Sequence, residues 1–119
     1  MTERRLSVAI TGAGFGASLH LDALRASSHV DVAGIYDIDL EVAMRLSDAH
    51  KIPHVYRSWH EVLSDADIDC VAVLVPPNLH EPLTLDALRA GKHVVCEKPL
   101  ARTVDECDRM LEEARRSPS

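Results

Sequence analysis

Residues 6–17, LSVAITGAGFGA, carry the strongest structural signal in the chain. A short run rich in Val and Ile leads directly into a glycine loop that fits the pattern G-x-G-x-x-[GA], with one extra glycine at Gly16. In this pattern Gly12 permits a tight turn, Gly14 lets a pyrophosphate approach the backbone, and small Ala17 lets the next helix pack closely on the sheet. Amide groups at the start of that helix can then bind phosphate. Glycines also serve plain strand-to-helix turns, so the loop alone leaves that interpretation open.

Strand-like and helix-like segments alternate along the chain. Short apolar runs are typical of strands buried on both faces, and they are Leu6–Ile10, Val30–Tyr36, Cys70–Val75, His93–Cys96 and, more weakly, His54–Tyr56. Helical spacing predicts helices over residues 17–26, 40–50 and 82–90, with Gly91 after the last. Further helix starts are marked by an N-cap at Asp39 and by two capping boxes, Ser58 to Glu61 and Thr103 to Glu106. This alternation predicts an α/β protein with a three-layer, doubly wound parallel sheet of about five strands, the Rossmann arrangement.

The composition narrows the class of protein. The 119 residues are enough for one domain, 1–119, and 46% hydrophobic with 3% aromatic content predicts an aliphatic core. The net charge of −6 and the scattered basic residues argue against nucleic acid, and the apolar runs are too short for a membrane span or a signal peptide. Three cysteines without a C-x-x-C pair (Cys70, Cys96 and Cys107) indicate reduced thiols in a cytoplasmic protein, with the first two buried in strands.

One histidine pair could suggest a metal site. His50 and His54 are four residues apart, but Pro53 between them interrupts the helix, so the two rings need not share a face. No cysteine or carboxylate completes a convincing set of ligands, and we expect no metal.

An acidic residue follows the second predicted strand. Asp37 lies about 20 residues past the glycines, where a carboxylate would accept the hydroxyls of an adenosine ribose. A carboxylate there would repel a 2′-phosphate, and no arginine directly follows, so the sequence favours NAD over NADP. The alternative is a plain loop residue or helix cap.

The fourth and fifth strands end in polar residues that should meet the same crevice. Pro76 and Pro77 stop the fourth strand, which lies beside the first where the strand order reverses, so Asn78 and His80 follow at the cofactor rim. Either of those two side chains could instead simply cap the next helix.

The fifth strand delivers Glu97 and Lys98 to this rim, and Pro99 restricts Lys98 to extended geometry. A lysine held there can donate a hydrogen bond or a proton to a substrate oxygen during hydride transfer, with Glu97 orienting it or touching the cofactor. The alternative is a solvated pair of opposite charges in a loop.

Four stretches together resemble the Gfo/Idh/MocA family of NAD(P)-dependent oxidoreductases, over roughly residues 6–116. They are VAITGAGFGASLH (8–20), YDID (36–39), VLVPPNLH (73–80) and LRAGKHVVCEKPLA (88–101). The resemblance implies a dinucleotide cofactor, NAD or NADP, and a sugar, cyclitol or related polyol as substrate. It implies cofactor contacts from Gly12, Gly14, Phe15, Gly16, Asp37, Val75, Pro76, Pro77, Asn78, His80, Glu97 and Lys98. Lys98, the lysine of the family's E-K-P motif, is then the catalytic residue that binds and polarises the substrate.

The chain departs from this family in length. Members usually have a second domain, an open antiparallel sheet that supplies most substrate contacts, and we expect this chain to lack that domain and the sixth strand of the dinucleotide fold. We therefore expect a domain that binds dinucleotide but turns over substrate poorly or not at all. We also expect an exposed edge at His93–Cys96 and a homo-oligomer formed through this edge or the neighbouring helix. A non-catalytic dinucleotide-binding sensor or interaction module is the alternative.

Overall fold

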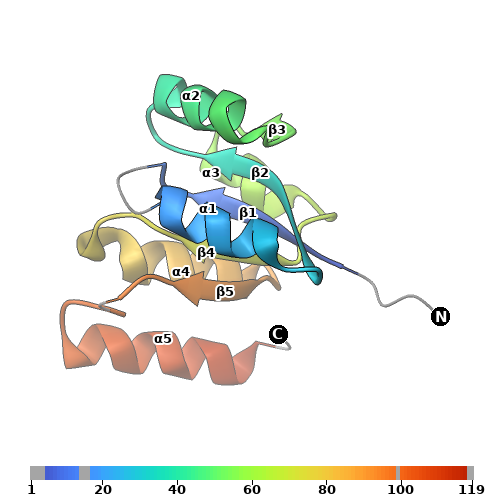
Figure 1. Ribbon diagram of the computed structural model, residues 1–119. Helices are drawn as coiled ribbons and strands as arrows, with labels where there is room; N and C mark the ends of the chain where they lie inside the picture. The colour runs from blue at the N-terminus through green and yellow to red at the C-terminus, as the bar shows by residue number, and fades with distance from the viewer. Residues whose placement is uncertain (1–4, 14–16, 99, 118–119) are drawn as a thin grey trace.

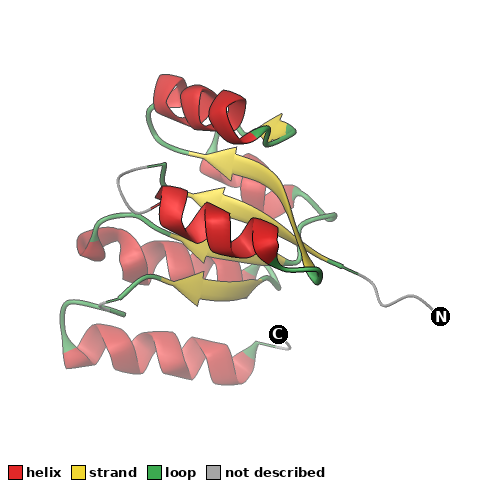
Figure 2. Cartoon of the chain, in the orientation of Figure 1, coloured by secondary structure: helices red, strands yellow, loops and turns green. Residues whose placement is uncertain are grey.

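The computed structural model describes residues 5–13, 17–98 and 100–117. These residues form a five-stranded sheet in the order β3–β2–β1–β4–β5, in which every neighbouring pair of strands is parallel (Figures 1 and 2). In chain order the elements are β1 (Leu6–Thr11), α1 (Ala17–Ala26), β2 (Val30–Tyr36), α2 (Leu40–His50), β3 (His54–Val55), α3 (Trp59–Ser64), β4 (Cys70–Val73), the 3₁₀ turn η1 (Pro77–Leu79), α4 (His80–Arg89), β5 (His93–Cys96) and α5 (Val104–Arg116). The chain moves outward from β1 to β3 and then returns to the other side of β1. The predicted doubly wound sheet of five strands is confirmed.

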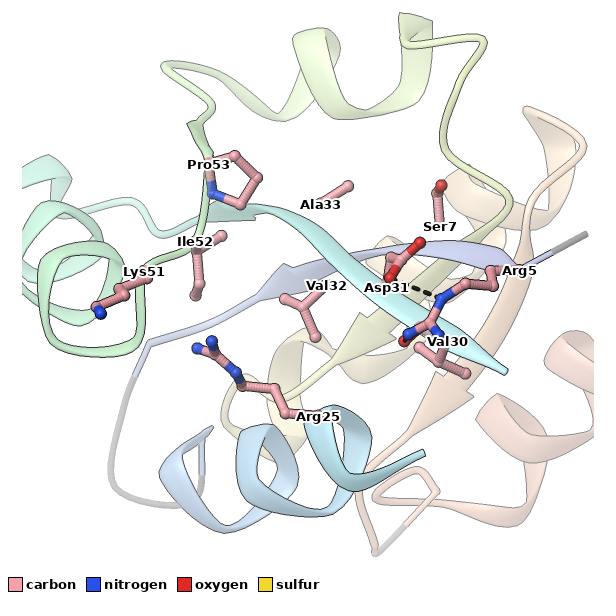
Figure 3. A pocket seen from close by; sticks show the side chains of 10 residues that line it. All are labelled: Arg5, Ser7, Arg25, Val30, Asp31, Val32, Ala33, Lys51, Ile52 and Pro53. Atoms are coloured by element: carbon pink, nitrogen blue, oxygen red, sulfur yellow. Dashed lines mark hydrogen bonds and ion pairs between the residues drawn. The ribbon is translucent and has the colours of Figure 1, made fainter. Parts of the chain in front are cut away.

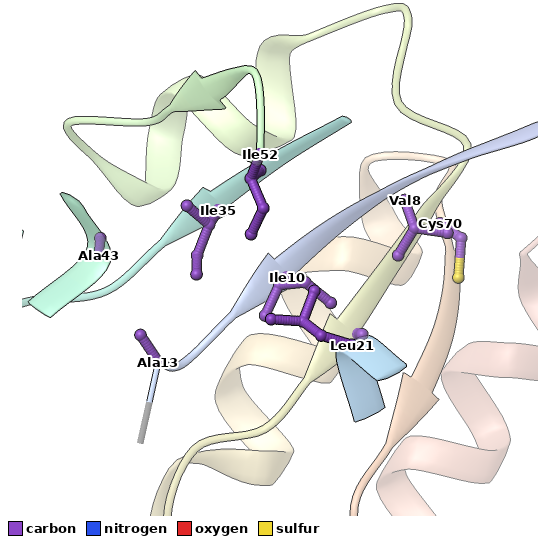
Figure 4. Close-up of a cluster of buried hydrophobic side chains, with 9 residues drawn as sticks. Val8, Ile10, Ala13, Leu21, Ile35, Ala43, Ile52 and Cys70 are labelled. Atoms are coloured by element: carbon purple, nitrogen blue, oxygen red, sulfur yellow. The ribbon is translucent and has the colours of Figure 1, made fainter. Parts of the chain in front are cut away.

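Two hydrophobic clusters cover the two faces of the sheet. Val8 and Ile10 of β1 pack against Leu21 of α1 in the first cluster (Figure 4), which also holds Ala13, Ile35, Ala43, Ile52, Cys70 and Ala72. Ala9, between those two β1 residues, belongs instead to the second cluster, with Tyr56, Val62, Ile68, Val71, Val73 and Ala87. Successive strand side chains point to opposite faces, so both faces of β1 and β4 are buried under helices. This burial explains why their sequences read as continuous apolar runs.

Some element boundaries differ from the prediction. β4 ends at Val73 rather than Val75, although the Leu74 amide still donates to Thr11 O at 2.8 Å. The helix expected from residue 82 begins at His80, directly after η1. Pro76 cannot donate a ladder hydrogen bond, and the chain turns into η1 from there.

The predicted caps are confirmed. The side chains of Asp39, Ser58 and Thr103 each accept a hydrogen bond from a backbone amide in the first turn of their helix, and all three have extended backbone dihedrals. None of the described helices combines the length and apolar content needed to cross a membrane.

The strand β5 forms one edge of the sheet. β5 pairs with β4 along Cys70–Val73, and among the described residues no strand pairs with its other side. Val95 is 53% exposed at this edge. Cys70 is buried as expected, but Cys96 is only half-buried because it lies in the edge strand, so the prediction that both are buried is wrong for Cys96.

Candidate cofactor-binding site

A cavity of about 290 Å³ lies at the carboxyl ends of β1, β2 and β4. The arrowheads in Figure 1 mark this edge of the sheet. The walls of the cavity are mainly apolar. They consist of Thr11, Gly12, Tyr36, Asp37, Ile38, Trp59, Leu74, Val75, Pro76, Leu79 and Leu83. Four residues predicted from the sequence to bind cofactor are therefore brought together here: Gly12, Asp37, Val75 and Pro76.

Gly12 forms the turn off β1. The backbone φ of Gly12 is +99°, which residues with a Cβ rarely adopt. A Cβ at this position would also lie 2.8 Å from the carbonyl carbon and oxygen of Leu74. The predicted tight turn is confirmed, and its glycine is required because the end of β4 packs directly against it. Gly14, Phe15 and Gly16 lie outside the described residues, so their contacts with a cofactor stay predictions.

Asp37 lies at the rim of the cavity and is half-buried. Its Oδ2 accepts a hydrogen bond from the Ala13 amide at 2.8 Å, and its Oδ1 accepts one from the Asp39 amide at 2.8 Å. The carboxylate thus ties the turn after β1 to the turn after β2. A carboxylate has about four acceptor positions, so these two bonds leave room for ribose hydroxyls.

Two aromatic residues in the wall of the cavity were not predicted from the sequence to belong to the site. Tyr36 and Trp59 lie with ring centroids 6.2 Å apart, and Trp59 Nε1 donates to Asp86 Oδ2 at 3.0 Å. Trp59 comes from α3, more than 20 residues past the strand end that it covers. Ile38, next to Asp37, is 94% exposed and adds an apolar surface to the same wall.

The residues after β4 divide into two groups. Val75 and Pro76 line the cavity, whereas Pro77 and Asn78 lie exposed in η1 and do not. His80 is 1% exposed, and its Nε2 is 2.7 Å from Val75 O. Neither Asn78 nor His80 makes a side-chain cap on α4, so the capping alternative is wrong. In this arrangement His80 holds the backbone of Val75 in place.

Glu97 and Lys98 lie at the same edge of the sheet but outside this cavity. Glu97 Oε2 pairs with His20 Nε2 of α1, and Oε1 accepts from the Lys98 amide at 2.9 Å. The hydrogen bond from His20, followed by that from the Lys98 amide, lowers the pKa of Glu97. Glu97 thus contacts His20, while the charge of the exposed Lys98 also acts on it. The alternative of a solvated Glu97–Lys98 pair stays open. The sequence missed His20 because 77 residues separate it from Glu97.

A larger cavity, of about 490 Å³, lies elsewhere (Figure 3). It borders the start of β2 and includes Arg25, Lys51 and Arg5, with Arg5 Nε donating to Asp31 Oδ1 at 2.8 Å. Ligands of open α/β sheets bind at the carboxyl ends of the strands, so the smaller cavity is the candidate site. Among residues 5–13, 17–98 and 100–117, no cluster of three or more His, Cys, Asp or Glu side chains could hold a metal.

Comparison with known proteins identifies the family. The sequence profile described as an oxidoreductase family with an NAD-binding Rossmann fold, Gfo/Idh/MocA, matches residues 6–119. The chain belongs to this family. Inositol 2-dehydrogenase of Salmonella typhimurium is 34% identical over 109 residues, which are 90% of this chain and 32% of that protein. Myo-inositol 2-dehydrogenase of Thermotoga maritima is 27% identical over 112 residues, which are 94% of this chain and 34% of that protein.

Two solved structures have a similar fold. GenD2 from gentamicin A biosynthesis, in complex with NAD, has a TM-score of 0.89 and 30% identity over 96% of this chain and 32% of its own. Levoglucosan dehydrogenase in complex with NADH and levoglucosan has a TM-score of 0.89 and 28% identity over 96% of this chain and 33% of its own. The chain spans about a third of the length of the relatives that it matches.

The described residues fit the cofactor of this family, NAD. The cavity suits a flat heteroaromatic base because its walls are apolar and partly aromatic, and Asp37 supplies acceptors at its rim. Thr11 also lines it, and the buried Thr11 Oγ1 has no hydrogen-bond partner among the described residues.

Proposed function

We propose that this chain is the cofactor-binding part of an oxidoreductase that transfers a hydride between NAD and a sugar, cyclitol or related polyol. One observation carries the proposal. The carboxyl ends of β1, β2 and β4 enclose an apolar cavity with the Asp37 carboxylate at its rim. Membership of Gfo/Idh/MocA, an NAD-binding oxidoreductase family, supports the same assignment.

Each part of the site has a role in this proposal. Gly12 and the loop after it bind the pyrophosphate at the start of α1. Asp37 accepts hydrogen bonds from the adenosine ribose, while Tyr36, Ile38 and Trp59 contact the adenine base. Val75, Pro76, Pro77 and Asn78 lie toward the nicotinamide, and His80 acts through the backbone of Val75 to which it is bonded.

Lys98 is the proposed catalytic residue. When bound, NAD supplies the group that accepts or donates the hydride. The exposed Lys98 side chain donates a hydrogen bond to the reacting oxygen of the substrate, which polarises a carbonyl or stabilises a developing alkoxide. Glu97 holds the backbone of Lys98 through the hydrogen bond from the Lys98 amide. A contact of Glu97 with the cofactor is part of the proposal.

The substrate class is proposed from the relatives. Inositol dehydrogenases act on a cyclitol, and levoglucosan dehydrogenase was solved with levoglucosan, a sugar derivative. The chain spans about a third of such proteins. We therefore propose that this chain by itself can bind the cofactor but lacks most of the contacts with substrate.

We also propose a cytoplasmic location, which the three free cysteines support.

Calorimetric titration with NAD, NADP and coenzyme A tests the binding proposal. The expected result is saturable binding of NAD, weaker binding of NADP and none of coenzyme A. Failure to bind either nicotinamide dinucleotide would reject it. Incomplete catalysis is tested separately, because steady-state hydride transfer by this chain on a panel of polyols would contradict that part.

A further inference from the structure

One side-chain contact joins two distant parts of the chain at the proposed cofactor crevice. Nε2 of His20, in the first turns of α1, contacts Oε2 of Glu97, the residue that follows β5. The two residues are 77 positions apart in the sequence. Their side chains are 34% and 39% exposed, so the contact is partly shielded from water.

The Glu97 carboxylate is held at both oxygens. Oε2 binds His20, and Oε1 accepts from the Lys98 amide at 2.9 Å. The Glu97 amide in turn donates to Val73 O at 3.0 Å, which extends the pairing of β5 with β4 past Cys96. The Lys98 backbone is thus connected through one side chain to α1, and through the preceding residue to the sheet.

Two basic side chains near the Glu97 carboxylate offset its negative charge. His20 faces it from α1 and Lys98 from the same strand end, and both favour its ionised form. α1 is the helix whose first turn is proposed to bind the cofactor's phosphates. An unpaired carboxylate beside that turn would repel them, and pairing with His20 offsets this repulsion.

An exposed ion pair usually contributes little. This one differs because the carboxylate also accepts from the amide of the proposed catalytic lysine, so a change in its orientation moves Lys98. We propose that His20 is a positioning residue, which holds Glu97 and, through it, the backbone of Lys98 in place against α1. This inference rests on the proposed function, and it assigns His20 a role in the same site.

The test uses the complete 119-residue chain and the variants His20→Leu and His20→Gln. Leucine removes the donor, whereas the glutamine amide can reach the same carboxylate oxygen. His20→Asn is a second polar variant that is too short to reach it. His50→Leu, the same substitution at the end of α2, is the control. For each variant, thermal unfolding measures the fold, a ¹H–¹⁵N spectrum reports the Lys98 amide, and calorimetry measures NAD affinity.

We expect His20→Leu and His20→Asn to shift the Lys98 amide proton away from its carboxylate-bonded position and to weaken NAD binding about tenfold. His20→Gln and His50→Leu should stay within about threefold of the unmodified chain. An unmoved Lys98 amide in folded His20→Leu and His20→Asn overturns the inference, as does equal impairment of His20→Gln. If the unmodified chain does not bind NAD, the proposed function fails, and the amide comparison alone still decides the role of His20.

Discussion

Asp37 is the residue expected to set the choice between NAD and NADP. Its carboxylate already accepts hydrogen bonds from the amides of Ala13 and Asp39, and Asp37 also lines the cavity. Asp37→Ala should lower NAD affinity about tenfold, because hydrogen bonds to a charged group contribute roughly 1.5–3 kcal/mol. It should lower NADP affinity less, since the repulsion of a 2′-phosphate is also removed.

Calorimetry with both dinucleotides measures this change. Asp48→Ala, which removes an exposed carboxylate from α2, is the matched control and should leave both affinities unchanged. An Asp37→Ala variant with an unaltered ratio of NAD to NADP affinity would show that this carboxylate does not contact the ribose.

The pairing of Glu97 should also appear in the pH dependence of stability. The pKa of this carboxyl in the folded chain lies below its ordinary value of 4.5, chiefly because His20 donates to it. A lowered folded pKa means that the stabilisation is fully present above pH 4.5 and is lost as the pH falls through the folded value. Glu97→Gln cannot ionise, so its free energy of unfolding should fall less steeply in this acid range. Denaturant titrations between pH 3 and pH 7 measure the difference; parallel curves for the two chains would contradict it.

At the scale of elements, the pairing of β2 with β3 depends on a small residue. A Cβ on Gly34 would lie 2.4 Å from Cε2 of the buried Tyr56 ring. That ring cannot move freely, because Tyr56 OH donates to Asp65 Oδ2 at 2.7 Å. Burial and this bond raise the pKa of Tyr56, so the donor keeps its proton. Gly34→Ala should therefore destabilise the fold by about 1–3 kcal/mol, the usual range for overpacking.

Equilibrium unfolding in urea measures that loss. Gly91→Ala is a useful comparison because its Cβ would meet no atom within 4 Å, so that only its φ of +82° opposes a side chain there. Equal stability of Gly34→Ala and the unmodified chain would mean that Tyr56 repacks without cost.

Most helices and strands of this chain can be predicted from the sequence, because they depend on the pattern of apolar residues and on hydrogen bonds between residues close in sequence. The alternation of Val8, Ala9 and Ile10 explains the burial of β1 on both faces, and Asp39 and Ser58 mark helix starts by local hydrogen bonds. The contacts of Trp59 and His20 could not be predicted. Each joins elements far apart in the sequence, and no local pattern records which helix covers a given strand end.

At the scale of the whole molecule, the β5 edge is the feature most open to association. Val95 is 53% exposed beside backbone groups that no described strand pairs with. Exposed apolar edge strands favour pairing with another chain, and a lysine on such an edge opposes it. We expect self-association of the chain and its loss in Val95→Lys.

Sedimentation velocity at increasing concentration measures the oligomeric state. Leu111→Lys, at a position 49% exposed on α5, controls for the general effect of replacing a surface apolar residue by a charge. A monomeric unmodified chain at high concentration would contradict the prediction, and so would equal effects of the two substitutions.

The central claim is that the carboxyl ends of the strands form the binding site for NAD. An NAD titration followed by ¹H–¹⁵N spectra of the labelled chain tests it most directly. The account predicts that the largest shifts occur at Gly12, Asp37 and Val75, around the cavity of about 290 Å³. No saturable shifts, or shifts concentrated around Arg25 and Lys51 in the other cavity, would contradict it.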